Sequence, residues 1–566
     1  MSNTKRIIVI GGSAAGPKTA AKARRLDYDA EITIIQKARD LSMASCGYPY
    51  YVGGLFDDRN QLVSTPAGVV RDPKFFLNAK GINARTETEA TAIDRKNRTI
   101  ACRDLRAGTT EVLPYDKLVL CTGATPVIPP VPGKDLKGIT TLQSMSDADY
   151  LRRVCDEGQI KKAVIIGGGL IGIETCEALE LAGIEITVIE LLPQLLTFLD
   201  WEMAKLVENH VRSRSANVIT GNGLAEFLGE NGRLTGVKLQ NGTELPCELA
   251  VVAVGVRPNV KLAADAGLAV GALGGIVVDE HMKTSDPDIY AAGDCVECRH
   301  RITGKPAYSP MGDLANLQGR VAGENVVRGD TAAFPGTIQT GICKIFDYIA
   351  GTTGLSETAA RKHGLTDIET VINANPDKPV FMGGKLIVSK MIVDRATRRL
   401  LGYQAVGPGD VSKQITAAAM AITAEMTVDD LLSLDFPYAP PFSPAIDHII
   451  TTAHIMQNKL EGRMRGISAG EVFRKLQGPD KPFLLDARGP DEYEASRLGL
   501  GETLIPLGAL RRRLGELPAD KGREIVCYCK LSLRGYEAAT VLMANGWTDI
   551  KVMEGGLAAW PFPMEK

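Results

Sequence analysis

The sequence has no excess of either charge, because 65 Lys and Arg residues stand against 67 Asp and Glu residues and leave a net charge of -2. Without a basic surplus, binding to nucleic acid or to an anionic membrane surface is not expected, and small molecules are the predicted partners. The chain also lacks an apolar stretch long enough to span a bilayer, and its first residues, MSNTKRIIVIGG, contain no secretory leader. These absences predict a cytoplasmic protein.

Cysteine is too sparse for a fold held together by disulfides, since 11 cysteines are scattered over 566 residues. This usage indicates a reducing compartment, where most cysteines are small core residues. Cys295 and Cys298 form a CxxC, but no second Cys or His pair complements them, so no metal site is predicted. Histidine is also scarce, and none follows His454. Any chemistry near the C-terminus must therefore proceed without an imidazole.

A chain of 566 residues predicts three or four domains. The apolar run 6–10 leads into GGSAAG and then into a helical pattern, which predicts a strand, a phosphate-binding turn and a helix. The next strand ends at Gln36, whose amide can hydrogen-bond a ribose. The same order recurs from Lys162 to Glu190, here with the full GxGxxG spacing. A single glycine turn is weak evidence, but two in the same strand-turn-helix-strand frame are strong evidence for dinucleotide binding.

Three further apolar strands end at small-residue turns, where the backbone can approach a ligand closely. They are LVLCTGATP (118–126), LAVVAVGVRPN (249–259) and TSDPDIYAAGDC (284–295).

With these motifs the chain resembles the flavoprotein disulfide reductases that contain two dinucleotide-binding folds. The resemblance implies an α/β protein with two Rossmann-like domains, the first binding FAD and the second binding NADH. The residues implied to bind FAD are Gly11, Ser13, Gly16, Gln36, Thr122, Gly123, Gly293 and Asp294. The residues implied to bind NADH are Gly167, Gly169, Gly172, Glu174 and Glu190. Glu190 favours NADH over NADPH, because its carboxylate accepts from a ribose 2'-hydroxyl and repels a 2'-phosphate.

The rest of the chain resembles two more domains. Residues 336–455 are similar to the α+β dimerisation domain of this family, and YAPPFS resembles a motif by which coenzyme A disulfide reductases send a tyrosine into the partner subunit's active site. Tyr438 holds that position, so a homodimer with a shared active site is implied. The segments DARGPDEYEASRLGLGETLIPLGAL, CYCKLSLRGY and EGGLAAW resemble a C-terminal α/β rhodanese domain over 463–566. The predicted FAD domain then covers 1–150 and 258–335, with the NAD domain inserted over 151–257.

The rhodanese-like segment departs from the usual pattern at one place, where Gly-His-Ile is replaced by Ser496, Arg497 and Leu498; that His is structural in the family. Its loop CKLSLR has six residues from Cys529 to Arg534, the spacing of rhodaneses that carry a persulfide, whereas related phosphatase loops have one more residue. Lys530 and Arg534 are expected to lower the thiol pKa. Ser532 stands where Gly is common.

Cys46, in SMASCGYPYY, has no second cysteine within the next fifty residues, so the CxxxxC pair of glutathione-type reductases is absent. The following residues predict a helix, whose N-terminus is expected to acidify the thiol. Two related groups use one cysteine. In coenzyme A disulfide reductases its redox partner is coenzyme A, and in NADH oxidases and peroxidases it cycles to sulfenic acid. Ser45 matches the peroxidases, but Ala14 stands where they have a His, which favours the reductase.

The predicted function is NADH-dependent reduction of a coenzyme A persulfide, polysulfide or disulfide, coupled to sulfur transfer by the rhodanese-like domain. The residues implied to be catalytic are Cys46, Cys529, Tyr438 and Arg534. Arg25 and Ser42 match positions that contact coenzyme A in the reductases. The predicted cofactors are FAD, NADH and coenzyme A. An NADH oxidase or peroxidase with an accessory sulfur-carrying domain is the alternative enzyme, and a redox sensor with two reporting thiols is the alternative without turnover.

Overall fold

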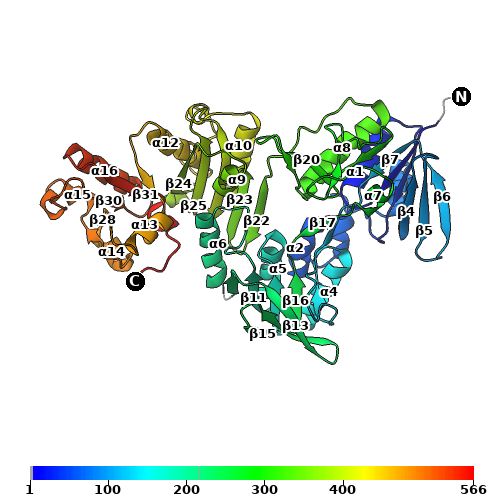
Figure 1. The fold of residues 1–566 in the computed structure, drawn as a ribbon, viewed down its shortest axis with the longest axis horizontal. Helices are drawn as coiled ribbons and strands as arrows, with labels where there is room; N and C mark the ends of the chain where they lie inside the picture. Colours follow the sequence, from blue (N-terminus) through cyan, green and yellow to red (C-terminus); the bar gives the residue numbers. More distant parts are fainter. Residues whose placement is uncertain (1–3, 215) are drawn as a thin grey trace. The chain divides into compact units, whose positions relative to one another are not determined.

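The structure is a computed structural model that describes residues 4–214 and 216–566, and Figure 1 shows its fold. The chain divides into two compact units. The first unit contains the residues up to 191 together with 222–337, and the second contains 192–221 together with 338–566. The predicted boundaries of the individual domains stay a prediction. Among the described residues, no helix combines the length and the apolar character needed to cross a lipid bilayer.

The first unit is built on a five-stranded parallel sheet with the order β19-β7-β1-β2-β3. Its strands are β1 (Arg6–Ile10), β2 (Glu31–Ile35), β3 (Asn83–Arg85), β7 (Lys117–Leu120) and β19 (Ile289–Ala291). The strands are continuous apolar runs because helices cover the sheet, as in β1, where the last four residues are buried. Two of these helices are α1 (Ala15–Leu26) and α8 (Gly312–Arg328), which pack closely at Gly319 and Gly323.

A second parallel sheet in the first unit repeats this arrangement, with the order β11-β10-β16-β9 among the strands of this unit. These strands are β9 (Ile139–Thr140), β10 (Lys162–Ile166), β11 (Glu185–Glu190) and β16 (Leu249–Val252). Helix α5 (Leu170–Glu180) follows β10, and α4 (Met145–Glu157) precedes it. An antiparallel pair, β8 (Ala124–Pro126) and β17 (Val256–Pro258), marks where the chain enters and leaves this part. The strands of this sheet lie in the chain between β7 and β19 of the first sheet.

Smaller elements complete the first unit. One three-stranded sheet consists of β4 (Thr88–Asp94), β5 (Thr99–Asp104) and β6 (Thr110–Pro114), and a second consists of β13 (Leu224–Glu230), β14 (Arg233–Leu239) and β15 (Glu244–Pro246). A third consists of β18 (Ile276–Val277), β20 (Val296–Arg299) and β21 (Pro306–Ala307). The helical segments are η1 (Ser45–Gly47), α2 (Tyr48–Val52), η2 (Arg59–Val63), α3 (Pro73–Lys80) and α7 (Lys261–Asp265).

The second unit begins with a five-stranded antiparallel sheet, β22-β23-β26-β25-β24. Its strands are β22 (Gly341–Ile345), β23 (Tyr348–Gly354), β24 (Ile368–Pro376), β25 (Leu386–Asp394) and β26 (Leu400–Gly407). Helix α10 (Val411–Thr423) packs on β26 and β23, and α12 (His448–Leu460) packs on β24. Helix α6 (Trp201–Ser213) contacts the same sheet, where Gln404 donates to the Asp200 carboxylate over 3.0 Å. This mixed sheet-and-helix layer is the α+β domain predicted after residue 336.

The C-terminal part of the second unit has a five-stranded parallel sheet, β27-β31-β30-β28-β29. Its strands are β27 (Gly466–Ile467), β28 (Phe483–Asp486), β29 (Thr503–Leu504), β30 (Ile525–Tyr528) and β31 (Ile550–Met553). Its helices are α13 (Ala469–Leu476), α14 (Pro490–Ala495), α15 (Leu507–Leu510) and α16 (Leu533–Ala544). Two separate apolar cores, one containing Leu485 and Cys527 and the other Leu484 and Tyr528, show that both sheet faces are covered. The predicted α/β domain is therefore confirmed.

Candidate active site

The first glycine turn is held tightly after β1. Gly11 has φ +111°, and a Cβ there would lie 1.9 Å from the Cys121 carbonyl oxygen, so only glycine fits. Gly16 lets α1 approach the turn, since its Cβ would lie 1.8 Å from the Gly11 carbonyl oxygen. Helix α1 begins without a side-chain cap, and Ser13 precedes it. A turn that leaves helical N–H groups uncapped suits the pyrophosphate of a dinucleotide.

Gln36 lies where the second strand of this fold ends. Its Oε1 accepts from the Gly12 N–H over 2.9 Å, and its Nε2 donates to the Asp40 carbonyl over 3.2 Å. The side chain therefore braces the glycine turn, and its predicted contact with a ribose stays a prediction.

Two other predicted FAD segments meet the same sheet edge. The Thr122 hydroxyl donates to the Asn259 carbonyl over 2.7 Å, and Gly123, with φ +66°, has open space where a side chain would stand. Gly293 precedes Asp294, whose carboxylate accepts from no donor among the described residues. Burial raises the pKa of Asp294. A half-buried acid without a donor suits the hydroxyl groups of a ribityl chain, so these residues fit FAD.

The second glycine turn has the same construction after β10. Gly167 has φ +108°, and Gly172 lets α5 approach the turn, since its Cβ would lie 2.0 Å from the Gly167 carbonyl oxygen. Gly169 has no heavy atom within 4 Å of its Cβ position, so a ligand can approach the backbone closely. The Glu190 carboxylate accepts from the Gly168 N–H over 2.8 Å. These residues fit a nicotinamide dinucleotide with its ribose at Glu190.

Cys46 lies in η1, and it is the one exposed cysteine among the eleven, all of which are free. A Cβ on Gly312 would lie 3.5 Å from the Cys46 Sγ, so the sulfur stands beside the first residue of α8. The negative charges that act on the thiol come from Glu174, Asp294 and Asp313. The structure therefore brings together three predicted residues, Cys46, Glu174 and Asp294, from segments far apart in the sequence.

The prediction that the helix lowers the pKa of the Cys46 thiol is wrong, because this pKa is raised. Helix α2 begins only at Tyr48 and has five residues, which gives it a small dipole. Partial burial raises the pKa of the Cys46 thiol, and the carboxylates of Glu174, Asp294 and Asp313 raise it further. The thiol is therefore largely protonated near neutral pH.

Glu174 is the second titratable group of this site. Burial raises the pKa of its carboxyl to about 7, although the Tyr50 hydroxyl donates to it over 3.3 Å. A carboxyl of this kind can exchange a proton at neutral pH.

The remaining predicted residues of the reductase site are the exposed Arg25 and Tyr438 and the half-buried Ser42. Arg25 is exposed in the last turn of α1, and Ser42 has φ 51° with its N–H bonded to the Gly12 carbonyl over 2.7 Å. Tyr438 belongs to the second unit, in a loop where it is 56% exposed. Their predicted contacts with coenzyme A and with a partner subunit stay predictions.

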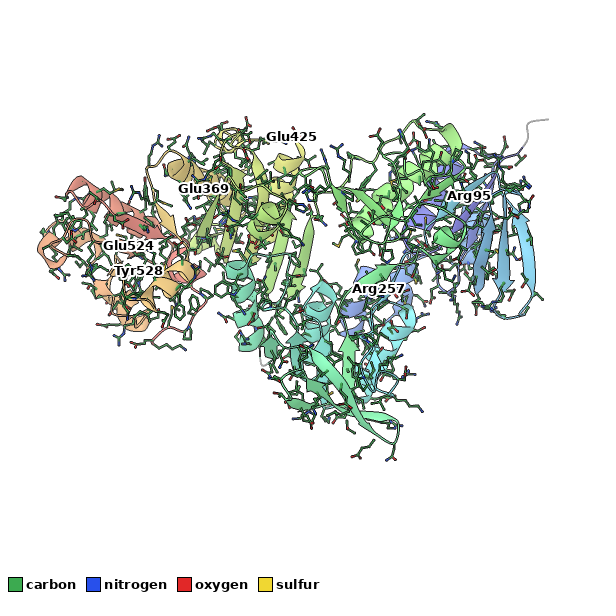
Figure 2. All side chains as sticks on the ribbon, in the orientation of Figure 1. Arg95, Arg257, Glu369, Glu425, Glu524 and Tyr528 are labelled. Carbon is green, nitrogen blue, oxygen red and sulfur yellow. The ribbon has the colours of Figure 1, made fainter. Side chains whose placement is uncertain are left out.

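The second thiol, Cys529, follows Tyr528 at the end of β30 and is 2% exposed (Figure 2 labels Tyr528). The Leu557 and Ala558 N–H groups donate to the carbonyls of Cys529 and Lys530, both over 3.0 Å. Ser532 has φ 88°, the left-handed conformation that explains why Gly is common here, and its hydroxyl donates to the Met553 carbonyl over 3.1 Å. These bonds occupy two carbonyls of the loop, and its N–H groups are the donors that a rhodanese-type loop is expected to offer to a sulfur anion.

Arg534, the last residue of this loop, forms an ion pair with Glu492 that the sequence analysis did not predict. Both of its terminal nitrogens donate to the Glu492 carboxylate, over 2.6 and 2.8 Å. This bidentate pair lowers the pKa of Glu492 to about 2 and raises the pKa of Arg534. Arg488, buried against Asp486, donates to the Glu492 carbonyl over 2.9 Å and holds that segment. The acidic run DEYE was the signal available in the sequence, but nothing local connects it to Arg534.

Ser496, Arg497 and Leu498, which replace the Gly-His-Ile motif, are held in place by contacts of Arg497 and by burial of Leu498. Arg497 forms an ion pair with Glu565 over 2.8 Å, and the two residues also pair through their backbones, while Leu498 is 3% exposed. The segment is therefore anchored by the C-terminal residues of the chain.

The other cysteines are core or half-buried residues. Cys295 is fully buried, and burial raises its pKa, while burial raises the pKa of Cys298 to about 11. Over residues 4–214 and 216–566, no group of three or more His, Cys, Asp or Glu side chains is arranged to hold a metal ion.

Sequence and structure comparisons give three family matches. The family described as pyridine nucleotide-disulphide oxidoreductase matches residues 5–312, its dimerisation domain matches residues 340–450, and the rhodanese-like domain matches residues 468–561.

Individual relatives extend these matches. The chain is 34% identical over 455 residues, 80% of this chain and 98% of the relative, to a protein named NAD(P)H coenzyme A polysulfide/persulfide reductase from Pyrococcus horikoshii. It is 33% identical over 459 residues, 81% of this chain and 100% of the relative, to a protein named NADH oxidase from Methanocaldococcus jannaschii. The solved structure of a NAD-dependent persulfide reductase from A. fulgidus matches with a TM-score of 0.93 and 42% identity, over 98% of this chain and 100% of that one.

The two glycine turns, the sulfur beside α8 and the CKLSLR loop all lie within the matched regions. The chain therefore belongs to the pyridine nucleotide-disulphide oxidoreductase family, with that family's dimerisation domain and a C-terminal rhodanese-like domain.

Proposed function

We propose that this protein is an NADH-dependent flavoprotein that reduces coenzyme A persulfide, polysulfide or disulfide through Cys46, and that its rhodanese-like domain transfers sulfane sulfur through Cys529. One observation carries the proposal: Cys46 is the exposed cysteine among eleven free ones, and none of the others pairs with it. A cysteine without a redox mate in its own chain can take the second sulfur from its substrate, and Ala14, which stands where the peroxidases have a His, disfavours the alternative cycle through sulfenic acid. The relatives named for persulfide reduction support this choice of substrate.

The proposed reaction at Cys46 is sulfur substitution followed by reduction. The Cys46 thiolate bonds to the inner sulfur of a coenzyme A persulfide, and hydrosulfide leaves, which produces a mixed disulfide between Cys46 and coenzyme A. FAD bound at the first glycine turn would supply the two electrons that cleave this disulfide, with NADH as their source. Overall, a persulfide and NADH yield a thiol, hydrosulfide and NAD⁺.

Residues of this chain supply proton transfer and binding in the proposal. Glu174, with its pKa near 7, can take the proton of the Cys46 thiol. Tyr438 of a second subunit would donate a proton to the departing thiolate, and Arg25 and Ser42 would contact coenzyme A. The carboxylate of Glu190 favours NADH. The proposal includes a homodimer and a cytoplasmic location, where eleven free cysteines suit a reducing compartment.

The reaction at Cys529 is a transfer without net oxidation. A thiolate acceptor attacks the outer sulfur of a Cys529 persulfide, a new S–S bond forms on the acceptor, and the Cys529 thiolate leaves. The loop N–H groups stabilise this sulfur anion.

Single substitutions of the two thiols test the proposal. We expect Cys46→Ser to abolish NADH-linked reduction of coenzyme A persulfide, measured by NADH absorbance and hydrosulfide release, and to leave thiosulfate sulfurtransferase activity within twofold of the wild type. Cys529→Ser should have the opposite effect with a small soluble persulfide as substrate. Equal loss of both activities in either variant contradicts the two-site scheme. NADH turnover with oxygen or peroxide that exceeds turnover with persulfide by tenfold would assign the protein to the oxidases instead.

A further inference from the structure

The end of strand β31 and the turn after it, residues 553–558, hold the backbone of the Cys529 loop in the second unit. The N–H groups of Leu557 and Ala558 donate to the first two carbonyls of this loop, both over 3.0 Å. Ser532, within the loop, donates its hydroxyl in the other direction, to the first carbonyl of the segment, over 3.1 Å. The position of segment 553–558 therefore determines where the loop lies.

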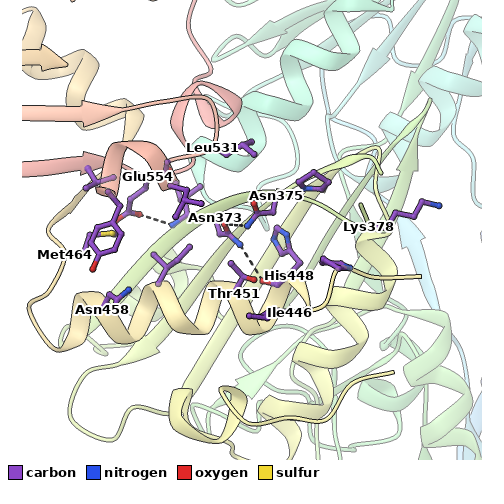
Figure 3. A pocket seen from close by; sticks show the side chains of 18 of the residues that line it. Asn373, Asn375, Lys378, Ile446, His448, Thr451, Asn458, Met464, Leu531 and Glu554 are labelled. Atoms are coloured by element: carbon purple, nitrogen blue, oxygen red, sulfur yellow. Dashed lines mark hydrogen bonds between the residues drawn. The ribbon is translucent and has the colours of Figure 1, made fainter. Parts of the chain in front are cut away.

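Glu554 connects this segment to the antiparallel sheet of the same unit. Its side chain is 5% exposed, and its carboxylate accepts from the Ile372 N–H of β24 over 2.9 Å and from the Lys459 ammonium of α12 over 2.5 Å. Figure 3 labels Glu554 and marks its bond to β24 with a dashed line. Lys459 is 10% exposed and also pairs with Glu369, on β24, over 3.0 Å. Since a buried ion cluster with several hydrogen bonds requires one geometry, we expect this cluster to fix the junction between the antiparallel sheet and the C-terminal domain.

Close backbone contacts leave this connection little room to move. A Cβ on Gly466, the first residue of β27, would lie 1.7 Å from the Glu554 Oε1. Farther along the segment, a Cβ on Gly556 would lie 2.3 Å from the Cys529 carbonyl oxygen. Only glycine allows contacts this short. Because a tightly packed interior transmits a shift of one group to its neighbours, a displacement of the Glu554 carboxylate is expected to move the Cys529 loop as well.

The chemistry proposed for the loop is sensitive to such a displacement. Hydrogen bonds weaken steeply as their distance and angle depart from the optimum, so a displaced loop offers weaker N–H donors to a sulfur anion. In an active site, loss of one donor to a developing anion lowers kcat on the order of 100-fold. Glu554 acts on Cys529 only through the backbone of segment 553–558, so its role is that of a positioning residue.

We propose that Glu554 positions the Cys529 loop for sulfur transfer, and that the antiparallel sheet thereby helps to set the activity of the C-terminal domain. The inference rests on the proposed sulfurtransferase function of Cys529. The position is set by the two bonds of the Glu554 carboxylate, to the Ile372 N–H and to Lys459. Lys459 retains its ion pair with Glu369 when Glu554 is replaced, so the replacement leaves no buried charge without a partner.

The test compares two carboxylates of the same ion cluster in the full-length holoenzyme. The assay contains thiosulfate as sulfur donor and cyanide as acceptor, without NADH, so that sulfite and thiocyanate are the products. Glu554→Ala should lower kcat at least tenfold. Glu369→Ala is the matched control, because it removes the other carboxylate bonded to Lys459 but belongs to β24 and not to segment 553–558; its kcat should stay within twofold of the wild type. Glu554→Gln keeps an oxygen that can accept from the Ile372 N–H, so its kcat should recover to within threefold of the wild type.

Stability measurements separate positioning from a merely structural role. Both alanine variants are expected to lower the urea midpoint of the second unit, but only Glu554→Ala should lower kcat in the absence of urea. Glu554→Asp keeps the charge and shortens the reach by one methylene, so this milder variant should lower kcat at least threefold.

The outcomes distinguish this inference from the function on which it rests. Equal kcat values for Glu554→Ala and Glu369→Ala, a wild-type kcat in Glu554→Asp, or a Glu554→Gln variant as slow as Glu554→Ala would each overturn the positioning role. If the wild type shows no thiosulfate-dependent transfer that Cys529→Ser abolishes, the proposed sulfurtransferase function fails, and the inference fails with it.

Discussion

Removing the buried cation Lys459 is the sharpest test of how the C-terminal domain is attached. In the variant Lys459→Met, Glu369 keeps its ion pair with Arg395 at 2.6 Å, but Glu554 keeps only the Ile372 N–H as a donor. One carboxylate that is 5% exposed therefore loses its countercharge. Breaking a buried pair in this way costs about 3–5 kcal/mol, and because Glu554 retains one hydrogen bond we expect about 3 kcal/mol.

Tryptophan fluorescence can report this loss for the second unit alone. The three tryptophans of the chain, Trp201, Trp547 and Trp560, all belong to that unit. With a urea m-value of about 1–3 kcal/mol/M, a loss of about 3 kcal/mol moves the midpoint of the fluorescence transition down by about 1 M or more. Adding Glu554→Gln to the variant removes the unpaired carboxylate charge and should recover about half of the lost unfolding free energy.

The matched control removes an ion pair nearer the surface. Lys475 is 33% exposed, and its partner Glu524 keeps a second ion pair with Lys551 at 2.6 Å (Figure 2 labels Glu524). Lys475→Met should therefore cost no more than about 1 kcal/mol. A loss below about 1 kcal/mol for Lys459→Met, or one equal to that of the control, would refute the claim that this cluster fixes the domain junction.

Two further predictions concern single residues of the two thiol sites. Ser532 has φ 88°, a backbone angle that glycine adopts freely and β-branched residues avoid. The unfolding free energy of Ser532→Gly should therefore stay within about 1 kcal/mol of the wild type, and that of Ser532→Val should fall by more than about 2 kcal/mol. Equal losses of unfolding free energy in urea would contradict this prediction. Glu174 has a folded pKa of about 7, above its unfolded value, so the folded state binds more protons and stability falls as pH rises from about 4.5 to 7. Glu174→Gln should flatten this part of the curve of Tm against pH, and an unchanged slope would assign the titration to another group.

Local sequence patterns predicted the parts of this fold whose construction is itself local. The two glycine turns follow apolar strands directly, and the backbone angles of Gly11 and Gly167 confirm the requirement for glycine. The Cys529 loop is also a continuous segment, so its residue spacing identifies it. In each case the strand, the turn or loop and the helix follow one another directly and lie within about thirty positions, as motif reasoning requires.

The electrostatic environment of Cys46 could not be predicted in the same way. The sequence pattern after the cysteine predicted a helix, but α2 is a short helix that begins two residues later, after a 3-10 turn. The groups that determine the thiol pKa, Glu174, Asp294 and Asp313, come from distant segments. The ion pair of Arg534 with Glu492 could not be predicted for the same reason, because the two residues are 42 positions apart in the sequence and only the folded structure brings them together. Charge around a site is a property of tertiary packing, and spacing along the chain does not encode it.

The two thiols of the proposed function differ in exposure. Cys46 is exposed, so a bulky disulfide or persulfide can reach the sulfur itself. Cys529 is 2% exposed within a loop that surrounds it, so a large acceptor can reach only an outer sulfur attached to it. These exposures agree with the proposed roles, in which Cys46 cleaves sulfur–sulfur bonds of large substrates and Cys529 holds sulfane sulfur and releases it to an acceptor. In the proposed scheme one site does not replace the other, because a thiol as enclosed as Cys529 is poorly placed to form the bulky mixed disulfide proposed at Cys46.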